Sequence, residues 1–249
     1  MAAPIRVQLC GHYRLYGDDG ERFDDALPGQ LGRLLVAYLV LRRPSPVTRD
    51  ELVEALWPGH PPTSRGSALT VLLSRVRSAL RDHVRGRGQL TIVLPAGSTV
   101  DVETAYAALH SAQSAVAQGD WRRAWAPALT AMFISRRRLL PEADVGWVEQ
   151  WRAGLEDVHI QALESYARAG LGLGGTELAS AERAARRLVE LAPLRESGQL
   201  VLVQTLAASG NVAEALTAYE RLRVTLREEL GTDPGPEMQL VYADLLARR

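Results

Sequence analysis

Arginine and small hydroxyl side chains recur along residues 62–84, whose sequence is PTSRGSALTVLLSRVRSALRDHV. Guanidinium groups bind phosphate oxygens and the acceptor edge of guanine, and hydroxyl groups can hydrogen-bond to either. The only carboxylate in this window is Asp82. These residue types favour recognition of an anionic partner, and the DNA major groove, which admits a helix, is the leading candidate. The arginines from residue 65 to residue 87 are Arg65, Arg75, Arg77, Arg81, Arg85 and Arg87.

A helix over about residues 64–82 would position these side chains. At ~100° per residue, one side of this helix is apolar and the other is small, polar and basic. A solvated helix face normally mixes both charge signs, because opposite charges four residues apart stabilise it. On this stretch alone, a plain amphipathic helix facing water stays open as the alternative. The polar side holds Ser67, Thr70, Val71, Ser74, Arg75, Ser78 and Arg81, with Arg77 on the flank.

The elements around this helix predict a winged helix-turn-helix. Residues 5–27 look like short strands, and residues 30–43 look like a mostly buried helix. Thr48 and Glu51 form a capping box at the start of a second helix, which a Pro/Gly loop joins to the third. After the third helix, QLTIVLPAGSTVDV predicts two strands around the turn at residues 95–97, a hairpin that would be the wing.

Beyond residue 102 the strand signals vanish and the helices repeat. Two segments share one plan, in which a helix ends in glycine and the next carries alanine where the helices cross. Ala181 and Ala215 lie 34 residues apart, which is the tetratricopeptide period. We therefore expect a superhelical helix stack, with a bundle that happens to repeat as the alternative.

Composition narrows the class of protein. The chain has 249 residues, is 47% hydrophobic and 23% charged, and so has the profile of a folded soluble protein. Its apolar runs stay short of the ~20 residues that a membrane span needs, and its start lacks a secretory signal. Cys10 is the single cysteine, which fits a cytoplasmic location. Net charge is zero, but residues 1–100 hold 13 arginines against 9 carboxylates.

The residue types that catalytic sites need are missing or scattered in this sequence, which argues against an enzyme. All 29 basic residues are arginine, so a Walker A lysine, a kinase lysine and a Schiff base are excluded. The glycines of residues 170–175 follow a helix rather than a strand, unlike a dinucleotide loop. Cys10 is expected to pack rather than react. We predict no catalytic residue, no cofactor and no metal, since His12, His60, His83, His110 and His159 lack metal-ligand spacing.

Both halves together resemble the Streptomyces antibiotic regulatory protein (SARP) family of transcriptional activators. The motifs that carry the resemblance are RVQLCGHYRL, TRDELVEALWPGHPP and SALTVLLSRVRSAL in the first half, and WVEQWRAGLEDVHIQALESYARAGL and ELGTDPGPE in the second. The resemblance implies an OmpR-type winged-helix DNA-binding domain over residues 1–101. It also implies a tetratricopeptide-like bacterial transcriptional activator domain over residues 102–249. The implied fold is mostly α, with a small N-terminal β-sheet and a wing hairpin.

The resemblance gives the third helix its roles on DNA. We expect Thr70, Val71, Ser74 and Arg75 to face bases in the major groove, with Arg75 at a base-contacting position of OmpR-type domains. Phosphate contacts, which position rather than specify, are expected from Arg65, Ser67, Arg77 and Arg81. For Arg77, a salt bridge within the domain is the alternative.

The predicted wing departs from the family, because residues 97–100 lack its usual aromatic side chain and no arginine follows Leu90 before the strand ends. Arg85 and Arg87, just upstream, are expected at the DNA backbone instead, and DNA binding should be weaker or more cooperative. The implied partners are double-stranded DNA with direct repeats, RNA polymerase holoenzyme and a second protomer on DNA, with no membrane. The implied function is activation of a secondary-metabolite gene cluster. An interaction regulator whose winged helix binds DNA weakly or not at all is the alternative.

Overall fold

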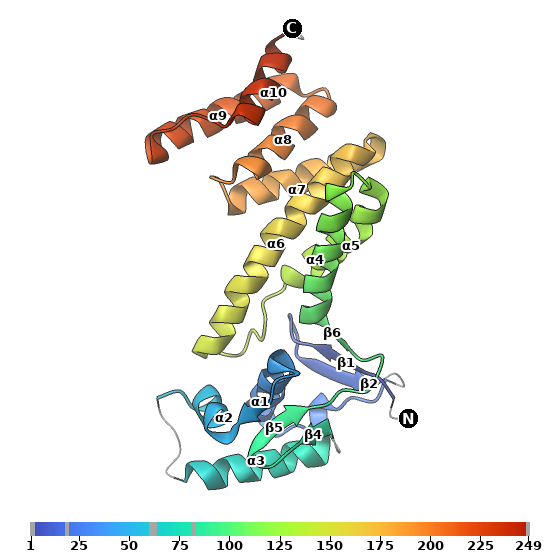
Figure 1. Cartoon of the computed structure of the whole chain (residues 1–249), viewed down its shortest axis with the longest axis vertical. Helices are drawn as coiled ribbons and strands as arrows, with labels where there is room; N and C mark the ends of the chain where they lie inside the picture. Colours follow the sequence, from blue (N-terminus) through green and yellow to red (C-terminus); the bar gives the residue numbers. More distant parts are fainter. Residues whose placement is uncertain (1–2, 18–19, 60–63, 81–82, 248–249) are drawn as a thin grey trace. The chain divides into compact units, whose positions relative to one another are not determined.

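The computed structural model describes residues 3–17, 20–59, 64–80 and 83–247. The chain divides into two compact units (Figure 1). The first comprises residues 1–104 and 137–155, and the second comprises residues 105–136 and 156–249. The first unit thus takes in a later segment of the chain, while the domain border at residues 101 and 102 stays a prediction. Among the described residues, no helix has the length and apolar character to cross a bilayer.

The first unit begins with a three-stranded sheet. Strand β1 (Ile5–Gln8) pairs antiparallel with β2 (Arg14–Gly17) and parallel with β6 (Thr99–Val100). The alternation of the strands buries Val7, Leu15 and Val100 on one face, as period-2 patterning requires. A 3-10 turn, η1 (Asp24–Ala26), follows β2.

Three helices complete the helix-turn-helix predicted from the sequence. They are α1 (Gly29–Arg42), α2 (Arg49–Leu56) and α3 (Arg65–Ala79). Helix α1 is central and buries Leu35, Val36 and Leu39. The capping box before α2 is confirmed, since the Glu51 N–H donates to Thr48 Oγ1 at 3.2 Å and the Thr48 N–H donates to Glu51 Oε2 at 2.7 Å.

A second small sheet holds the hairpin that follows α3. Its strands are β3 (Val47–Thr48), β4 (Val84–Arg85) and β5 (Gln89–Ile92), in the order β3-β5-β4. Strands β4 and β5 pair antiparallel around residues 86–88. The hairpin therefore lies one strand earlier than the sequence predicted.

The predicted turn at residues 95–97 does exist, but it joins two sheets. The Ser98 N–H donates to the Pro95 carbonyl at 3.1 Å, after which β6 pairs with β1 and not with β5. The hairpin turn instead depends on Gly86, which has φ +90°, where a Cβ would lie 1.9 Å from the Gln89 carbonyl oxygen. Only glycine fits there.

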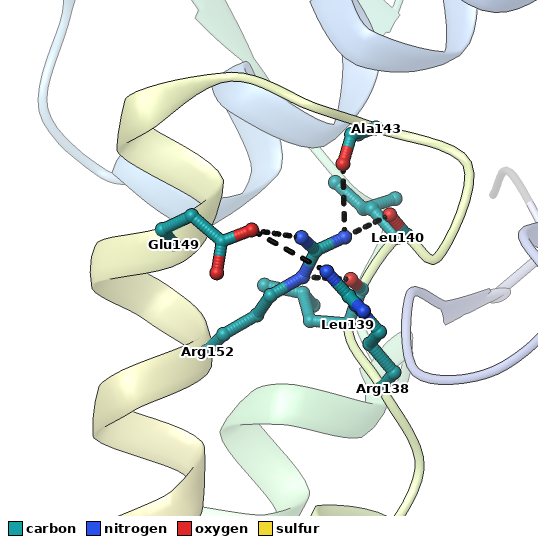
Figure 2. A network of polar contacts seen from close by, with 6 residues as sticks. All are labelled: Arg138, Leu139, Leu140, Ala143, Glu149 and Arg152. Carbon is teal, nitrogen blue, oxygen red and sulfur yellow. Dashed lines mark hydrogen bonds and ion pairs between the residues drawn. The ribbon is translucent and has the colours of Figure 1, made fainter.

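A loop at residues 136–145 and the start of α6 (Gly146–Leu173) also belong to the first unit from residue 137 onward. Figure 2 shows how Arg152 of α6 holds this loop. Its Nε donates to the Leu139 carbonyl at 2.9 Å, and its Nη2 donates to the carbonyls of Leu140 and Ala143 at 2.6 and 3.0 Å. Glu149 pairs with the same guanidinium. The loop closes on the first sheet, where the Leu140 N–H donates to the Leu9 carbonyl at 2.9 Å.

The second unit is built from helices. They are α4 (Asp101–Ala117) and α6 in their second-unit parts, with α5 (Trp121–Ser135), η3 (Gly175–Glu177), α7 (Leu178–Leu191), α8 (Glu196–Ala208), α9 (Val212–Leu230) and α10 (Pro236–Ala247). Helix α8 packs against α7 and α9, and α10 packs on α8 and α9. Ala181 and Ala215 are fully buried, so small side chains do stand where the helices pack. The predicted fold class is confirmed: mostly α, with small N-terminal sheets followed by a helical array.

Candidate nucleic-acid interface

Helix α3 packs its apolar side against the core of the first unit and exposes its other side to solvent. Leu69, Leu72, Leu73 and Val76 are buried, and α3 packs against α1 and α2. The four predicted base readers lie on the exposed side, namely Thr70, Val71, Ser74 and Arg75. Val71 is 53% exposed. The structure therefore brings the four together on one face, and their role stays a prediction.

The charges on this face have one sign. Arg65 and Arg75 make no hydrogen bond or ion pair with any residue that the structure describes, and α3 contains no carboxylate. Ser67 is exposed beside Arg65, whereas Arg81 lies outside the described residues. Arg65 is the first residue of α3, where a cation opposes the helix dipole. An anion near this helix start would relieve that cost.

Arg77 has a different environment from the other arginines of α3. Its side chain is half-buried, its Nε donates to the Val84 carbonyl at 3.3 Å, and its Nη2 donates to the Gly86 carbonyl. Both acceptors belong to β4 and the hairpin turn. The salt bridge considered as its alternative is not formed with any described residue, so Arg77 connects α3 to the hairpin.

The hairpin after α3 carries arginine at its tip. Arg87 is exposed between Gly86 and Gly88 in the turn between β4 and β5, and Figure 1 shows this hairpin beside α3. At its base, the Val93 N–H donates to the His83 carbonyl at 2.8 Å. The hairpin after α3 is therefore β4–β5 and not the strand pair expected around residues 95–97, while a DNA contact by either turn stays a prediction. The sequence signals a turn more strongly at residues 95–97 (Pro-Ala-Gly) than at residues 85–88 (Arg-Gly-Arg-Gly). The signal for the observed hairpin is the arginine flanked by two glycines in the second run.

Sequence reasoning missed Arg49, the first residue of α2. Its Nη2 donates to Thr70 Oγ1 at 2.7 Å and to the Gly66 carbonyl at 3.3 Å. Thr70 Oγ1 itself donates to the Gly66 carbonyl at 2.6 Å. The available signal was a cation at the first position of a capped helix, which the helix dipole disfavours. Arg49 thus joins α2 to the exposed side of α3.

Cys10 and Asp101 form a buried polar contact at the end of β1. The Asp101 carboxylate accepts the N–H groups of Leu9 and Cys10 at 2.8 to 3.0 Å, and burial raises its pKa despite these hydrogen bonds. Burial, with the Asp101 charge next, also raises the pKa of the Cys10 thiol far above its usual range. The thiol stays protonated and unreactive, so the prediction that Cys10 packs is confirmed.

These features define the class of protein. An exposed, one-sign helix in a helix-turn-helix, an arginine-tipped hairpin after it and a helical array later in the chain make up a winged-helix transcriptional regulator.

Comparisons with known proteins assign the family. The model of the bacterial transcriptional activator domain matches residues 100–246. The regulatory protein AfsR of Streptomyces coelicolor is 31% identical over 244 residues, or 97% of this chain and 24% of AfsR. The transcriptional regulator RedD of the same species is 30% identical, over 87% of this chain and 64% of RedD. The chain belongs to the bacterial transcriptional activator domain family and is a regulator of SARP type.

A solved structure shares the fold. Mycobacterium tuberculosis EmbR, solved in complex with a low affinity phosphopeptide, superposes with a TM-score of 0.83 over 100% of this chain and 66% of that chain, at 24% identity. By sequence, the transcriptional regulatory protein EmbR of Mycobacterium tuberculosis is 27% identical over 93% of this chain and 61% of EmbR. The chain thus spans less than two thirds of AfsR and of EmbR.

Proposed function

We propose that this regulator is a sequence-specific DNA-binding transcriptional activator that places α3 in the major groove. The observation that carries the proposal is the exposed side of α3, where Arg75 is unpaired among the described residues and no carboxylate stands near it on the helix. Such a face has no opposite charge on its own helix to pair with, whereas major-groove acceptors would pair with its donors.

Each predicted reader has a chemical role in the groove. Arg75 donates to O6 and N7 of guanine together, which discriminates against other bases by about 1–3 kcal/mol. Val71 contacts a thymine methyl group, for which its exposure leaves room. Ser74 and Thr70 lie on the same exposed side as Arg75 and complete the reading face.

Phosphate contacts come from both sides of the reading face. Arg65 and Ser67 at the start of α3 and Arg77 near its end keep the roles that the sequence predicted, as does Arg81, which lies outside the described residues. Arg87 joins them from the wing tip, where it reaches the DNA beside the groove that α3 occupies. Because Arg77 spends two donors on the hairpin, its larger contribution is to hold that wing.

Two protomers are needed on the DNA because one protomer recognises too few base pairs. One small domain specifies about four or five base pairs, too few against the ~10⁶–10⁹ competing sites of a genome. Two protomers on direct repeats about one helical turn apart would double that information on one face of the DNA. The helical array then holds the second protomer and RNA polymerase holoenzyme. Resemblance to the SARP family supports a secondary-metabolite gene cluster as the target.

Selection of binding sites from a random double-stranded DNA library by the full chain tests the proposal. Arg75→Ala should weaken binding to the selected site about tenfold to a hundredfold, from the loss of one guanine contact. Binding to random DNA should change little. Arg221→Ala is the matched control, because Arg221 is an exposed arginine of α9 with no ion pair among the described residues. Equal effects of both variants would contradict the assignment.

Spacing offers a second measurement on the same selected DNA. Inserting half a turn, about 5 base pairs, between the repeats should abolish joint binding, and a full turn of about 10 should restore it. The alternative, an interaction regulator with weak or no DNA binding, drew its support from a wing without arginine and from the zero net charge. The β4–β5 hairpin with Arg87 counts against the first of these two observations.

A further inference from the structure

The hydroxyl of Thr70 is already committed within the protein. A threonine hydroxyl has one hydrogen to donate and two lone pairs. Its hydrogen goes to the Gly66 carbonyl at 2.6 Å, and one lone pair receives the Arg49 Nη2 donor at 2.7 Å. The hydroxyl therefore cannot donate to O6 or N7 of guanine or to O4 of thymine. These neighbours leave free the methyl group and one lone pair, which can only accept a hydrogen bond.

We propose that Arg49 is a positioning residue that turns Thr70 into a reader of a thymine methyl group. This inference rests on the proposed DNA binding and refines it, because Thr70 then reads by apolar contact and not by donating a hydrogen bond. Arg49 is on α2 and Thr70 is on α3, so the contact sets the Thr70 rotamer from outside its own helix.

Arg49 is well placed to act in this way. The same Nη2 also donates to the Gly66 carbonyl at 3.3 Å, so the guanidinium contacts both the hydroxyl and the acceptor of that hydroxyl. A planar fork holds such a pair of acceptors with less loss of freedom than an ammonium group. Arg49 forms no ion pair with a described residue that would draw it away from α3.

The test replaces each thymine of the selected DNA site by deoxyuracil, which removes only the C5 methyl group. Binding of the full chain is measured for the wild type and for Thr70→Ser, Thr70→Val and Arg49→Ala. Thr70→Ser keeps the hydroxyl and lacks the methyl group, whereas Thr70→Val keeps a methyl group and lacks the hydroxyl. Thermal unfolding confirms that each variant is folded, and Arg221→Ala controls for loss of one positive charge.

One uracil substitution should weaken wild-type binding about fourfold, the value of one buried methyl group. Thr70→Ser should remove that penalty, and Thr70→Val should retain it. Arg49→Ala should also remove the uracil penalty, although Thr70 is intact. In the Thr70→Val background, Arg49→Ala should leave the uracil penalty unchanged. A lost charge alone would lower affinity for all DNA and leave the uracil penalty unchanged.

Two results overturn the inference. If Thr70→Ser leaves every uracil penalty as in the wild type, the methyl contacts belong to other side chains such as Val71. If Arg49→Ala keeps the Thr70 penalty, Arg49 does not position Thr70. A wild-type chain that selects no DNA sequence would refute the proposed function itself, which is a distinguishable outcome.

Discussion

Replacing Arg77 with alanine should weaken DNA binding more through the wing than through a lost phosphate contact. Arg77 donates to the carbonyls of Val84 and Gly86, the first at 3.3 Å. A hydrogen bond from a charged group contributes about 1.5–3 kcal/mol when its geometry is good. Because Arg77 is half-exposed and one bond is long, we expect about 1–2 kcal/mol for the pair after solvent screening. The free energy of unfolding should fall by that amount in Arg77→Ala.

A double-mutant cycle with Arg87 separates the two roles. If Arg77 acts by holding the wing, Arg77→Ala lowers DNA affinity only while Arg87 is present, so the two effects on Kd are not additive. Fluorescence anisotropy with the selected DNA measures the four affinities. Arg77→Met is the matched variant, because it keeps an apolar stem and removes only the donors. Amide hydrogen exchange in β4 and β5 should quicken in both Arg77 variants.

Additive effects would refute this reasoning. An Arg77 that contacts phosphate independently would lower the salt slope by about 0.9 when removed, whether or not Arg87 is present. Unchanged hydrogen exchange in the hairpin would refute it as well, because the two carbonyl contacts would then not restrain the wing.

Three further outcomes follow from the same geometry. Gly86→Ala should lower the unfolding free energy by about 1–3 kcal/mol and weaken DNA binding, since its Cβ would lie 1.9 Å from a carbonyl oxygen. Gly88→Ala, whose Cβ has open space, should be near neutral in the same thermal unfolding assay, and equal effects would contradict the turn assignment. Arg87→Ala should reduce the slope of log K against log salt by about 0.9, while an unchanged slope would remove Arg87 from the phosphate contacts. Arg152→Ala should cost about 3 kcal/mol of unfolding free energy by leaving three carbonyls unpaired, against little change for the exposed Arg138→Ala.

Local patterns predicted the elements that carry the candidate interface. The period of apolar residues in α3 predicts which side is buried. It therefore places Thr70, Val71, Ser74 and Arg75 on the exposed side, where the structure has them. The Thr48–Glu51 capping box needs only residues three apart, and it forms as predicted. Ala181 and Ala215 were identified by their spacing and are fully buried. These successes share one cause, because each signal lies within a few turns of one helix or in a repeat.

Pairings between distant residues were not predictable in the same way. Strands β4 and β6 have two residues each, too short for alternation to show which strand they pair with. The residue types favour a hairpin turn at residues 95–97. In the structure β5 pairs instead with β4, around the turn that Gly86 permits. The return of residues 137–155 to the first unit depends on contacts such as the Leu140 N–H with the Leu9 carbonyl and the Trp147 indole N–H with the Ala55 carbonyl. Arg152 then holds the loop of this segment through three of the segment's own carbonyls (Figure 2). A backbone carbonyl leaves no mark in the sequence.

The arginines in and beside α3 differ in their partners. Arg65 and Arg75 have no ion pair or hydrogen bond among the described residues, whereas Arg49 and Arg77 donate to backbone carbonyls of α3 and of the wing. A guanidinium that spends its donors on carbonyls keeps its charge but loses freedom to move, because the fork is rigid. Arg49 and Arg77 therefore add positive potential at the two ends of α3 while fixing its neighbours. In the proposed interface Arg75 reads a base while Arg65 and Arg87 contact phosphate, so counting arginines along the sequence overstates how many can read bases.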